Sequence, residues 1–414
     1  MGGLVLGVAL LLGSPSPADD PRLYGRVLTT DGTVIEGFLR WDRNEAAFAD
    51  FIDAVKVVPD SVLREAERVD PAFAAEMRRQ RSIVAFGMRL TWDRDDLAGP
   101  LRTPSSIVLA DVASIEPVDA RRIGLTLIDG EAVELFGSTT DLGPTLRGLE
   151  IDEGEGEPTV LRWRDVGRVE FLPAPTGRRP TASRLYGTVR TWGGHEFEGF
   201  VAWDRDEVLS SDVLDGREDG VQYEIRFDDI ESIAPEGRRS ARVRLRSGVE
   251  RVLRGTNDVD QTNRGIEVSV PTLGRVLVPW GDLTEVRFHE PAGPSGDSPP
   301  WTGRPGAAIE GTVHARDGRT ISGTIRWGHD EERLWEVLDG RSGETEFDVR
   351  FASIARITPE GEGAAVELLD GRVFRLEGTD DVGPEHRGVF VQPMEGRARR
   401  LIRWADVERV EFVR

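Results

Sequence analysis

Short runs of alternating apolar and polar residues, separated by turn residues, make up most of this chain, a pattern that predicts antiparallel β-strands. Arg22–Thr29 and Thr33–Trp41 show the alternation first, and the Asp31-Gly32 pair between them is typical of a tight hairpin turn. Gly193-Gly194 and Asp317-Gly318 stand at the matching points later in the chain, and these residues tolerate positive φ. The pattern therefore predicts a mainly β protein.

One stretch occurs three times. Glu198–Trp203 returns earlier as Glu36–Trp41 and later in the run that ends at Trp327. The copies keep their spacing, because Gly187 to Phe288 and Gly311 to Phe412 both span 101 positions. A fixed period of this length is the signature of repeated structural units. We predict repeat unit 1 at 20–172, unit 2 at 184–289 and unit 3 at 308–414. Between them we predict linkers at 173–183 and 290–307, whose Pro and Gly content allows the units to move.

Each unit contains two similar halves. A half begins with a hairpin, continues with a middle strand and a further strand, and closes with a tight turn and a last strand, as in Ile225–Ile233 and Trp280–Phe288. This order resembles the SH3-like or Sm-like small β-barrel, whose last two strands are joined by one helical turn. The resemblance implies three tandem units of two small barrels each. The chain is also similar to exported bacterial repeat proteins without assigned activity. It implies no particular function.

Unit 1 carries an insertion. Trp41 and Ile107 are 66 positions apart where Trp203 and Ile225 are 22 apart, a difference of 44, and we place the insertion at 55–105. Pro59–Arg68 and Pro71–Arg79 begin with helix-capping residues and continue with good helix formers, which predicts a helical hairpin. The insertion is either specific to function or a cap over an exposed end of the array.

Composition and charge narrow the function. The chain has 53 Lys and Arg against 74 Asp and Glu, a net charge of -21, and this balance excludes nucleic acid as an expected partner. The chain has no cysteine, which excludes disulfides and thiolate chemistry. An apolar run at Leu4–Leu12, followed by small residues up to Ala18, predicts a signal peptide at 1–19 and export to the periplasm or the cell exterior. No later stretch is apolar enough for a transmembrane segment in the mature chain.

Repeated carboxylates are the main candidates for chemistry. Asn257 and Asp258 follow Gly255-Thr256, and Asp380 and Asp381 follow Gly378-Thr379, so calcium is a possible ligand of these loops. The spacing matches no EF-hand, and we favour capping of the turn by these side chains. We further expect Arg264 to pair with Asp258 and close the loop. No other cofactor is expected, since no histidine recurs in all three units and nucleophile and phosphate-loop motifs are absent.

Ten tryptophans raise the question of sugar binding. Six recur at equivalent places and are expected in the core: Trp41, Trp163, Trp203, Trp280, Trp327 and Trp404. Four lie outside the repeat pattern and are the candidates for ligand contacts: Trp92, Trp192, Trp301 and Trp335.

These features predict an exported, non-enzymatic binding or structural protein with an unidentified protein or glycan partner. Two alternatives stay open. One is a hydrolase of cell-wall or polysaccharide substrates, which needs two carboxylates roughly 5 to 9.5 Å apart in one cleft. The other is a calcium-dependent adhesion module, which needs carboxylates that converge in the folded loops.

Overall fold

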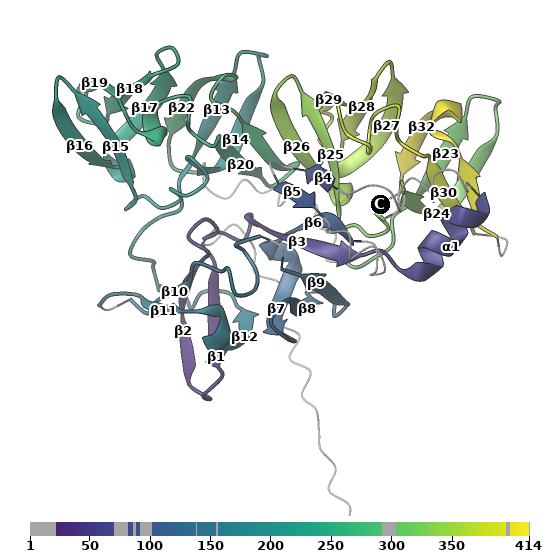
Figure 1. Ribbon diagram of the computed structural model, residues 1–414, viewed down its shortest axis with the longest axis horizontal. Helices are drawn as coiled ribbons and strands as arrows, with labels where there is room; N and C mark the ends of the chain where they lie inside the picture. Colours follow the sequence, from purple (N-terminus) through teal and green to yellow (C-terminus); the bar gives the residue numbers. More distant parts are fainter. Residues whose placement is uncertain are drawn as a thin grey trace, which may run out of the picture.

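The fold is mainly β, as the alternation predicted, and consists of two large antiparallel sheets and one separate hairpin (Figure 1). The computed structural model describes residues 22–69, 82–85, 88–91, 102–137, 139–154, 156–291, 304–328, 330–394 and 398–413. Within these residues, no helix has the length and apolar character needed to cross a membrane. Below, unit 1 denotes residues 22–172, unit 2 residues 184–289 and unit 3 residues 308–413.

Unit 1 contains β1 (Tyr24–Thr29), β2 (Val34–Trp41), β3 (Phe51–Val57), α1 (Asp60–Val69), β4 (Ser82–Ala85), β5 (Met88–Thr91), β6 (Arg102–Val108), β7 (Val112–Pro117), β8 (Arg122–Leu127), β9 (Ala132–Phe136), β10 (Leu149–Asp152), β11 (Thr159–Leu161) and β12 (Val166–Phe171). Unit 2 contains β13 (Tyr186–Thr191), β14 (Glu196–Ala202), β15 (Val213–Glu218), β16 (Val221–Arg226), β17 (Ile230–Pro235), β18 (Ser240–Leu245), β19 (Glu250–Arg254), β20 (Ile266–Val270), β21 (Gly274–Val278) and β22 (Leu283–Phe288). Unit 3 contains β23 (Glu310–Ala315), β24 (Thr320–Trp327), β25 (Val337–Ser342), β26 (Thr345–Arg350), β27 (Ile354–Glu360), β28 (Gly363–Leu368), β29 (Val373–Glu377), β30 (Val389–Pro393), β31 (Arg400–Ile402) and β32 (Val407–Phe412).

The three units pair their strands in the same order. Unit 1 follows β6-β3-β9-β8-β7-β12-β1-β2-β10-β11, and the register pairs of unit 2 give the equivalent order β16-β15-β19-β18-β17-β22-β13-β14-β20-β21. Gly187 lies opposite Phe288 in unit 2 and Gly311 opposite Phe412 in unit 3. A Cβ on Gly187 would lie 2.3 Å from the carbonyl oxygen of Arg287, so this close approach of β13 to β22 requires glycine.

The halves of a unit do not form separate closed barrels, in contrast to what the small-barrel resemblance implied. β14 and β15 belong to the first half of unit 2, yet β14 pairs with β20 and β15 with β19, both from the second half. The expected one-turn breaks are present as 3₁₀ turns, for example at Phe227–Asp229 and Trp404–Asp406. The sequence pattern thus located the strands and turns, but hydrogen bonding between the halves joins each unit into one open sheet.

Units 2 and 3 are continuous with each other. β21 of unit 2 pairs antiparallel with β26 of unit 3, with Arg275 opposite Asp348 and Val276 opposite Phe347. The buried apolar side chains of both units also form one cluster, whereas those of unit 1 form a second cluster. The expectation that Pro- and Gly-rich linkers let the units move is therefore wrong for this pair, because a shared sheet and a shared core join them.

The insertion of unit 1 is narrower than predicted. Val55–Val57 belongs to β3, and β6 begins at Arg102, so the inserted segment is 58–101. The first predicted helix is present as α1, and the β4–β5 hairpin follows later. The second predicted helix, Pro71–Arg79, lies outside the described residues. In Figure 1, α1 lies beside β24 and β30 of unit 3, and Glu65 of α1 bonds Arg326 there at 2.9 Å. The inserted segment therefore contacts unit 3 through α1.

Candidate metal centre and the carboxylates between the units

An acidic turn follows the second strand of unit 2. β14 leads into Trp203, and Asp204 and Arg205 then adopt φ values of 48° and 61°. The turn is closed by two backbone hydrogen bonds, from Trp203 N to Glu207 O at 2.9 Å and from Glu207 N to Trp203 O at 3.0 Å. The positive φ values reverse the chain within one turn, and this places the carboxylates of Asp204 and Glu207 on the same side.

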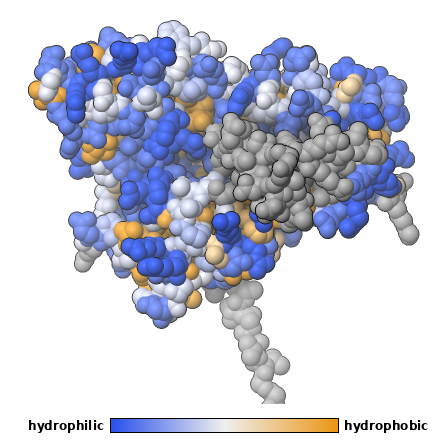
Figure 2. Space-filling view, in the orientation of Figure 1, coloured by the Kyte–Doolittle hydropathy of each residue, from blue (hydrophilic) through white to orange (hydrophobic). Residues whose placement is uncertain are grey.

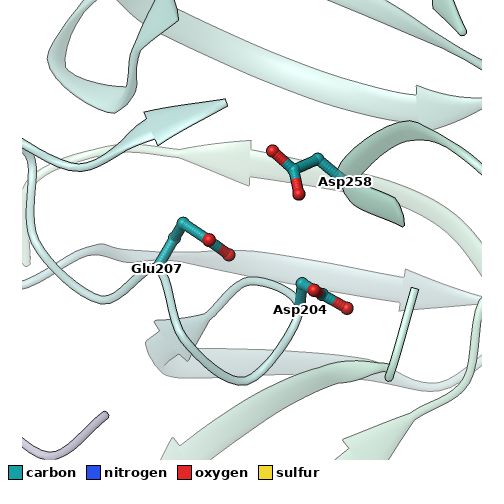
Figure 3. Close-up of side chains that lie close together, drawn as sticks. All are labelled: Asp204, Glu207 and Asp258. Carbon is teal, nitrogen blue, oxygen red and sulfur yellow. The ribbon is translucent and has the colours of Figure 1, made fainter. Parts of the chain in front are cut away.

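Three carboxylates converge at this turn. Ligand oxygens of Asp204, Glu207 and Asp258 all lie within 4.8 Å of one another, and Figure 3 shows the three side chains close together. No other group of three or more His, Asp or Glu side chains in the described ranges meets this criterion. Of these three residues, Asp258 was a predicted calcium candidate.

Asp258 is a structural residue of its loop, but its carboxylate bonds the backbone of another strand and not, as the capping interpretation had expected, that of its own turn. Its Oδ2 accepts the backbone N–H of Asp215 at 2.7 Å, and its carbonyl oxygen accepts Nε1–H of Trp203 at 2.9 Å. Asp381 of unit 3 makes the same two bonds, to Asp339 N at 2.7 Å and Trp327 Nε1 at 3.0 Å. The loop aspartates therefore fasten the third strand and a core tryptophan. Asp380, the neighbouring calcium candidate, has an exposed side chain.

Arg264 pairs with a different carboxylate from the one expected. Its Nη2 lies 3.0 Å from Asp204 Oδ2 and 2.6 Å from Asp206 Oδ2, and no hydrogen bond joins it to Asp258 among the described contacts. Asn257, the other calcium candidate in this loop, donates from Nδ2 to the same Asp204 oxygen. The predicted Arg264–Asp258 pair is wrong because Asp258 is already bonded to the β15 backbone.

Glu207, the third carboxylate of the triad, holds a proton at neutral pH. Burial, followed by the charges of Asp258, Asp204 and Asp206, raises the pKa of Glu207 to about 9. Burial also raises the pKa of Asp258 to about 6. Glu45 and Glu331 occupy the same place in units 1 and 3, and burial raises the pKa of both well above the usual range. In all three glutamates, Oε2 is buried without a hydrogen-bond partner in the described part of the chain.

The triad fits a metal ion poorly. Ca²⁺ takes six to eight oxygen ligands, but both oxygens of Asp204 already accept hydrogen bonds from Arg264, and one also accepts from Asn257. A cation would therefore lie beside the Arg264 guanidinium and be repelled by it. Asp204 and Asp258 are also buried, whereas the carboxylate pair of a glycosidase lies in a cleft that the substrate enters.

A second set of carboxylates, which sequence reasoning missed, joins the units. Asp50, Asp212 and Glu336 each stand nine positions after the tryptophan that begins the acidic turn. Each accepts two backbone N–H groups of its own loop, as Asp212 Oδ2 does from Val208 and Leu209. Aligning the three copies would have revealed this shared acid.

Each of these loop carboxylates also binds a cation from another unit. Arg184 of unit 2 bonds both oxygens of Asp50 at 3.0 Å, with both side chains 2% exposed. Arg40 of unit 1 bonds both oxygens of Asp212 at 2.9 Å. The third pair is Glu336 with Lys56, the chain's single lysine, at 2.5 Å. Bidentate and buried ion pairs of this kind set the relative positions of the units.

Arg275 occupies the point where all three units meet. Its Nη2 lies 2.7 Å from Asp53 of unit 1 and 2.6 Å from Asp348 of unit 3. Arg275 itself is 2% exposed. Burial tends to raise the pKa of Asp53, but the charge and hydrogen bonds of Arg275 lower it below the usual value. Ser106 completes the cluster by donating to Asp53 at 2.6 Å.

The tryptophans divide as follows. The six repeat-equivalent residues are buried, which confirms the core prediction. Trp335 is also buried, at 4% exposure, because it inserts into the apolar cluster of unit 1, so it is not a surface ligand contact. Trp92 and Trp301 lie outside the described residues. Trp192 is 75% exposed at the tip of the β13–β14 hairpin, where its backbone N–H donates to Asp282 O at 2.8 Å.

A surface hollow of about 470 Å³ lies between residues of units 2 and 3. Arg238, Gln261, Trp280 and Gly281 of unit 2 line it together with Glu344 of unit 3. Asp282, which anchors Trp192, directly follows Gly281.

Comparison of the chain with family models, with curated proteins and with solved structures gives no match. The geometry of this molecule therefore carries the functional argument alone.

Proposed function

We propose that this protein is an exported, non-enzymatic structural module whose three units act as one rigid body. The observation that carries the proposal is the use of the same loop carboxylate in every unit to bind a cation from another unit. These acidic side chains would otherwise be candidates for chemistry, but they form ion pairs that join the units. Figure 2 agrees with a role in water, because the visible face is largely hydrophilic with small apolar patches.

Calorimetric unfolding of the purified chain tests the rigid-body part. We expect one cooperative transition with equal calorimetric and van't Hoff enthalpies, because every unit loses buried ion pairs when a neighbour unfolds. Arg275→Met should lower the midpoint temperature of that single transition. Arg26→Met, which alters an exposed pair, should change the free energy of unfolding by no more than about 0.5 kcal/mol. Separate transitions for the units would contradict the proposal.

The proposal that the protein is exported predicts a mature chain that begins near Asp19. Mass spectrometry of the exported protein measures this N-terminus.

A second candidate function is glycan binding at Trp192 and the hollow, which are linked because Trp192 bonds Asp282, the residue after Gly281 of the lining. An exposed indole face can stack on a sugar ring, and Arg238, Gln261 and Glu344 offer hydrogen-bond donors and acceptors to hydroxyl groups. Unit 1 has Thr30 and Pro144 at the positions of Trp192 and Gln261, so it lacks this combination of side chains. Binding to soluble oligosaccharides, followed by Trp192 fluorescence, should be lost in Trp192→Ala and retained in Arg316→Ala, the matching hairpin tip of unit 3.

A further inference from the structure

Two sheet edges of the molecule lack a partner strand within the described residues and carry no proline. β16 pairs with β15 alone, and β31 pairs with β30 alone. The backbone N–H and C=O groups along such an edge can accept another strand. Val221, Gln222, Glu224 and Arg226 of β16 are all exposed, so this edge is open to solvent.

The chain itself shows what covers the edge that is equivalent to β16. β26 occupies the place of β16 in unit 3, since Asp348 pairs with Asp339 as Glu224 pairs with Asp215. β21 of unit 2 covers β26, and as a result Phe347, Asp348 and Val349 are at most 1% exposed. In the same way, β31 occupies in unit 3 the place of β21 in unit 2. β31 is the last strand in the pairing order of its unit and pairs with β30, as β21 is the last strand in unit 2 and pairs with β20. Within the described residues, units 2 and 3 together therefore leave one edge of each kind without a partner strand, at β16 and at β31.

The residues on these two edges are complementary in the register of the internal junction. Arg275 of β21 lies opposite Asp348, and the equivalent positions are Arg399, next to β31, and Glu224 of β16. The register also places Leu401 opposite Gln222, as Leu277 lies opposite Glu346. An arginine and a carboxylate would thus meet again across the new pair of strands.

The corresponding edges of unit 1 carry proline instead. Pro158 stands before β11 at the position of Arg275, and Pro104 lies within β6 at the position of Glu346. Proline has no N–H to donate, and it protects sheet edges from pairing. Of these four edges, β16 and β31 are the unprotected pair.

We propose that β16 is the docking strand for a second copy of this chain, which adds its β31 antiparallel in the register that β21 has on β26. The two edges lie at opposite ends of the continuous sheet, with β16 at one end of Figure 1 and β30 near the other, so a chain cannot pair its own edges. The contact is therefore head-to-tail, and it generates open-ended assemblies unless the rotation closes a ring.

Arg399, like Arg275, lies beside carboxylates of two units. Arg275 bonds Asp53 of unit 1 and Asp348 together. The Nη1 of Arg399 lies 3.6 Å from Glu65 of unit 1 and 3.1 Å from Glu332, and a guanidinium carries five N–H groups. Glu224 of a second copy would be the additional acceptor. The contact extends the proposed structural role by naming its partner, and it does not require the units to unfold together.

Sedimentation velocity of the purified full chain, over a concentration series at about 0.15 M salt where charges more than about 8 Å apart are screened, tests the proposal. The average mass should rise steadily with concentration. Glu224→Arg and Arg399→Glu should each weaken association about tenfold or more, because like charges then face each other across the strands. An equimolar mixture of the two variants should restore association, since the arginine introduced at position 224 of one chain then meets the glutamate introduced at position 399 of the other. Glu362→Arg, an equal charge change on an exposed turn, should have no such effect.

A chain that remains monomeric at every concentration would overturn the proposal. Association that both edge variants leave unchanged would overturn it as well, because the contact would then involve other surfaces. If Arg399→Glu does not fold, Arg399→Gln, which removes the charge and keeps an amide, replaces it and should still weaken association.

Discussion

The acidic turns of units 2 and 3 share a tryptophan, an aspartate and a glutamate at matching positions but balance their charge differently. In unit 2, Arg264 of the same unit bonds Asp204 and Asp206, and Glu207 keeps its proton. In unit 3, Gly328 replaces the aspartate, and Lys56 arrives from unit 1 to lie 3.5 Å from Glu331 and 2.5 Å from Glu336. The comparison shows that the carboxylates of this turn can be neutralised by a cation of their own unit or can bind a cation that attaches another unit.

Removal of the lysine should give the largest effect. Lys56→Met leaves Glu336, Glu331 and Asp330 without their cation, and breaking a buried pair in this way should cost about 3 to 5 kcal/mol in the free energy of unfolding. Urea denaturation at pH 7 measures the loss. The loss should shrink near pH 4, where the acids bind protons in both variants. A loss no larger than that of Arg26→Met, the exposed control, would show that Lys56 does not attach the units.

Glu207→Gln should act in the opposite direction. The folded pKa of about 9 lies above the unfolded value of about 4.3, so the folded state keeps a proton that the unfolded state releases, and stability is lost as pH rises between these values. The amide removes this penalty. We expect the variant to be more stable than the parent by about 2 to 4 kcal/mol at pH 8, with little difference at pH 4. Thermal unfolding at both pH values checks this, with the exposed Glu362→Gln as control, and a destabilised variant at pH 8 would contradict it.

Calcium should have the smallest effect. Because Arg264 already neutralises Asp204, unfolding in chelator and in about 1 mM Ca²⁺ should give midpoints that agree within about 1 °C. The comparison between the two turns would sharpen if calcium did raise the midpoint by several degrees and if Glu207→Gln removed that rise. The turn of unit 2 would then take a metal ion where the turn of unit 3 takes Lys56.

Sequence reasoning succeeded where the requirement is local. The Asp31-Gly32 turn, the 3₁₀ turn at Phe227–Asp229 and helix α1 all depend on φ preferences, capping and apolar alternation within a few residues. It failed at Trp335, which breaks the repeat because it packs into the core of unit 1 and not because it contacts a ligand. It also failed for Arg264, whose partner depends on which carboxylate has already been bonded by backbone.

What the sequence determined by itself is therefore the set of strands, their turns, their recurrence and the six buried tryptophans. Only the tertiary structure decided that β14 pairs with β20, that β21 pairs with β26, and that Lys56 reaches Glu336 across 280 positions of chain. The physical reason is that every strand edge offers the same N–H and C=O groups, and every carboxylate accepts any nearby cation. Alternation and spacing describe which face a side chain takes, whereas the choice among equivalent partners is made by the packing of the whole chain.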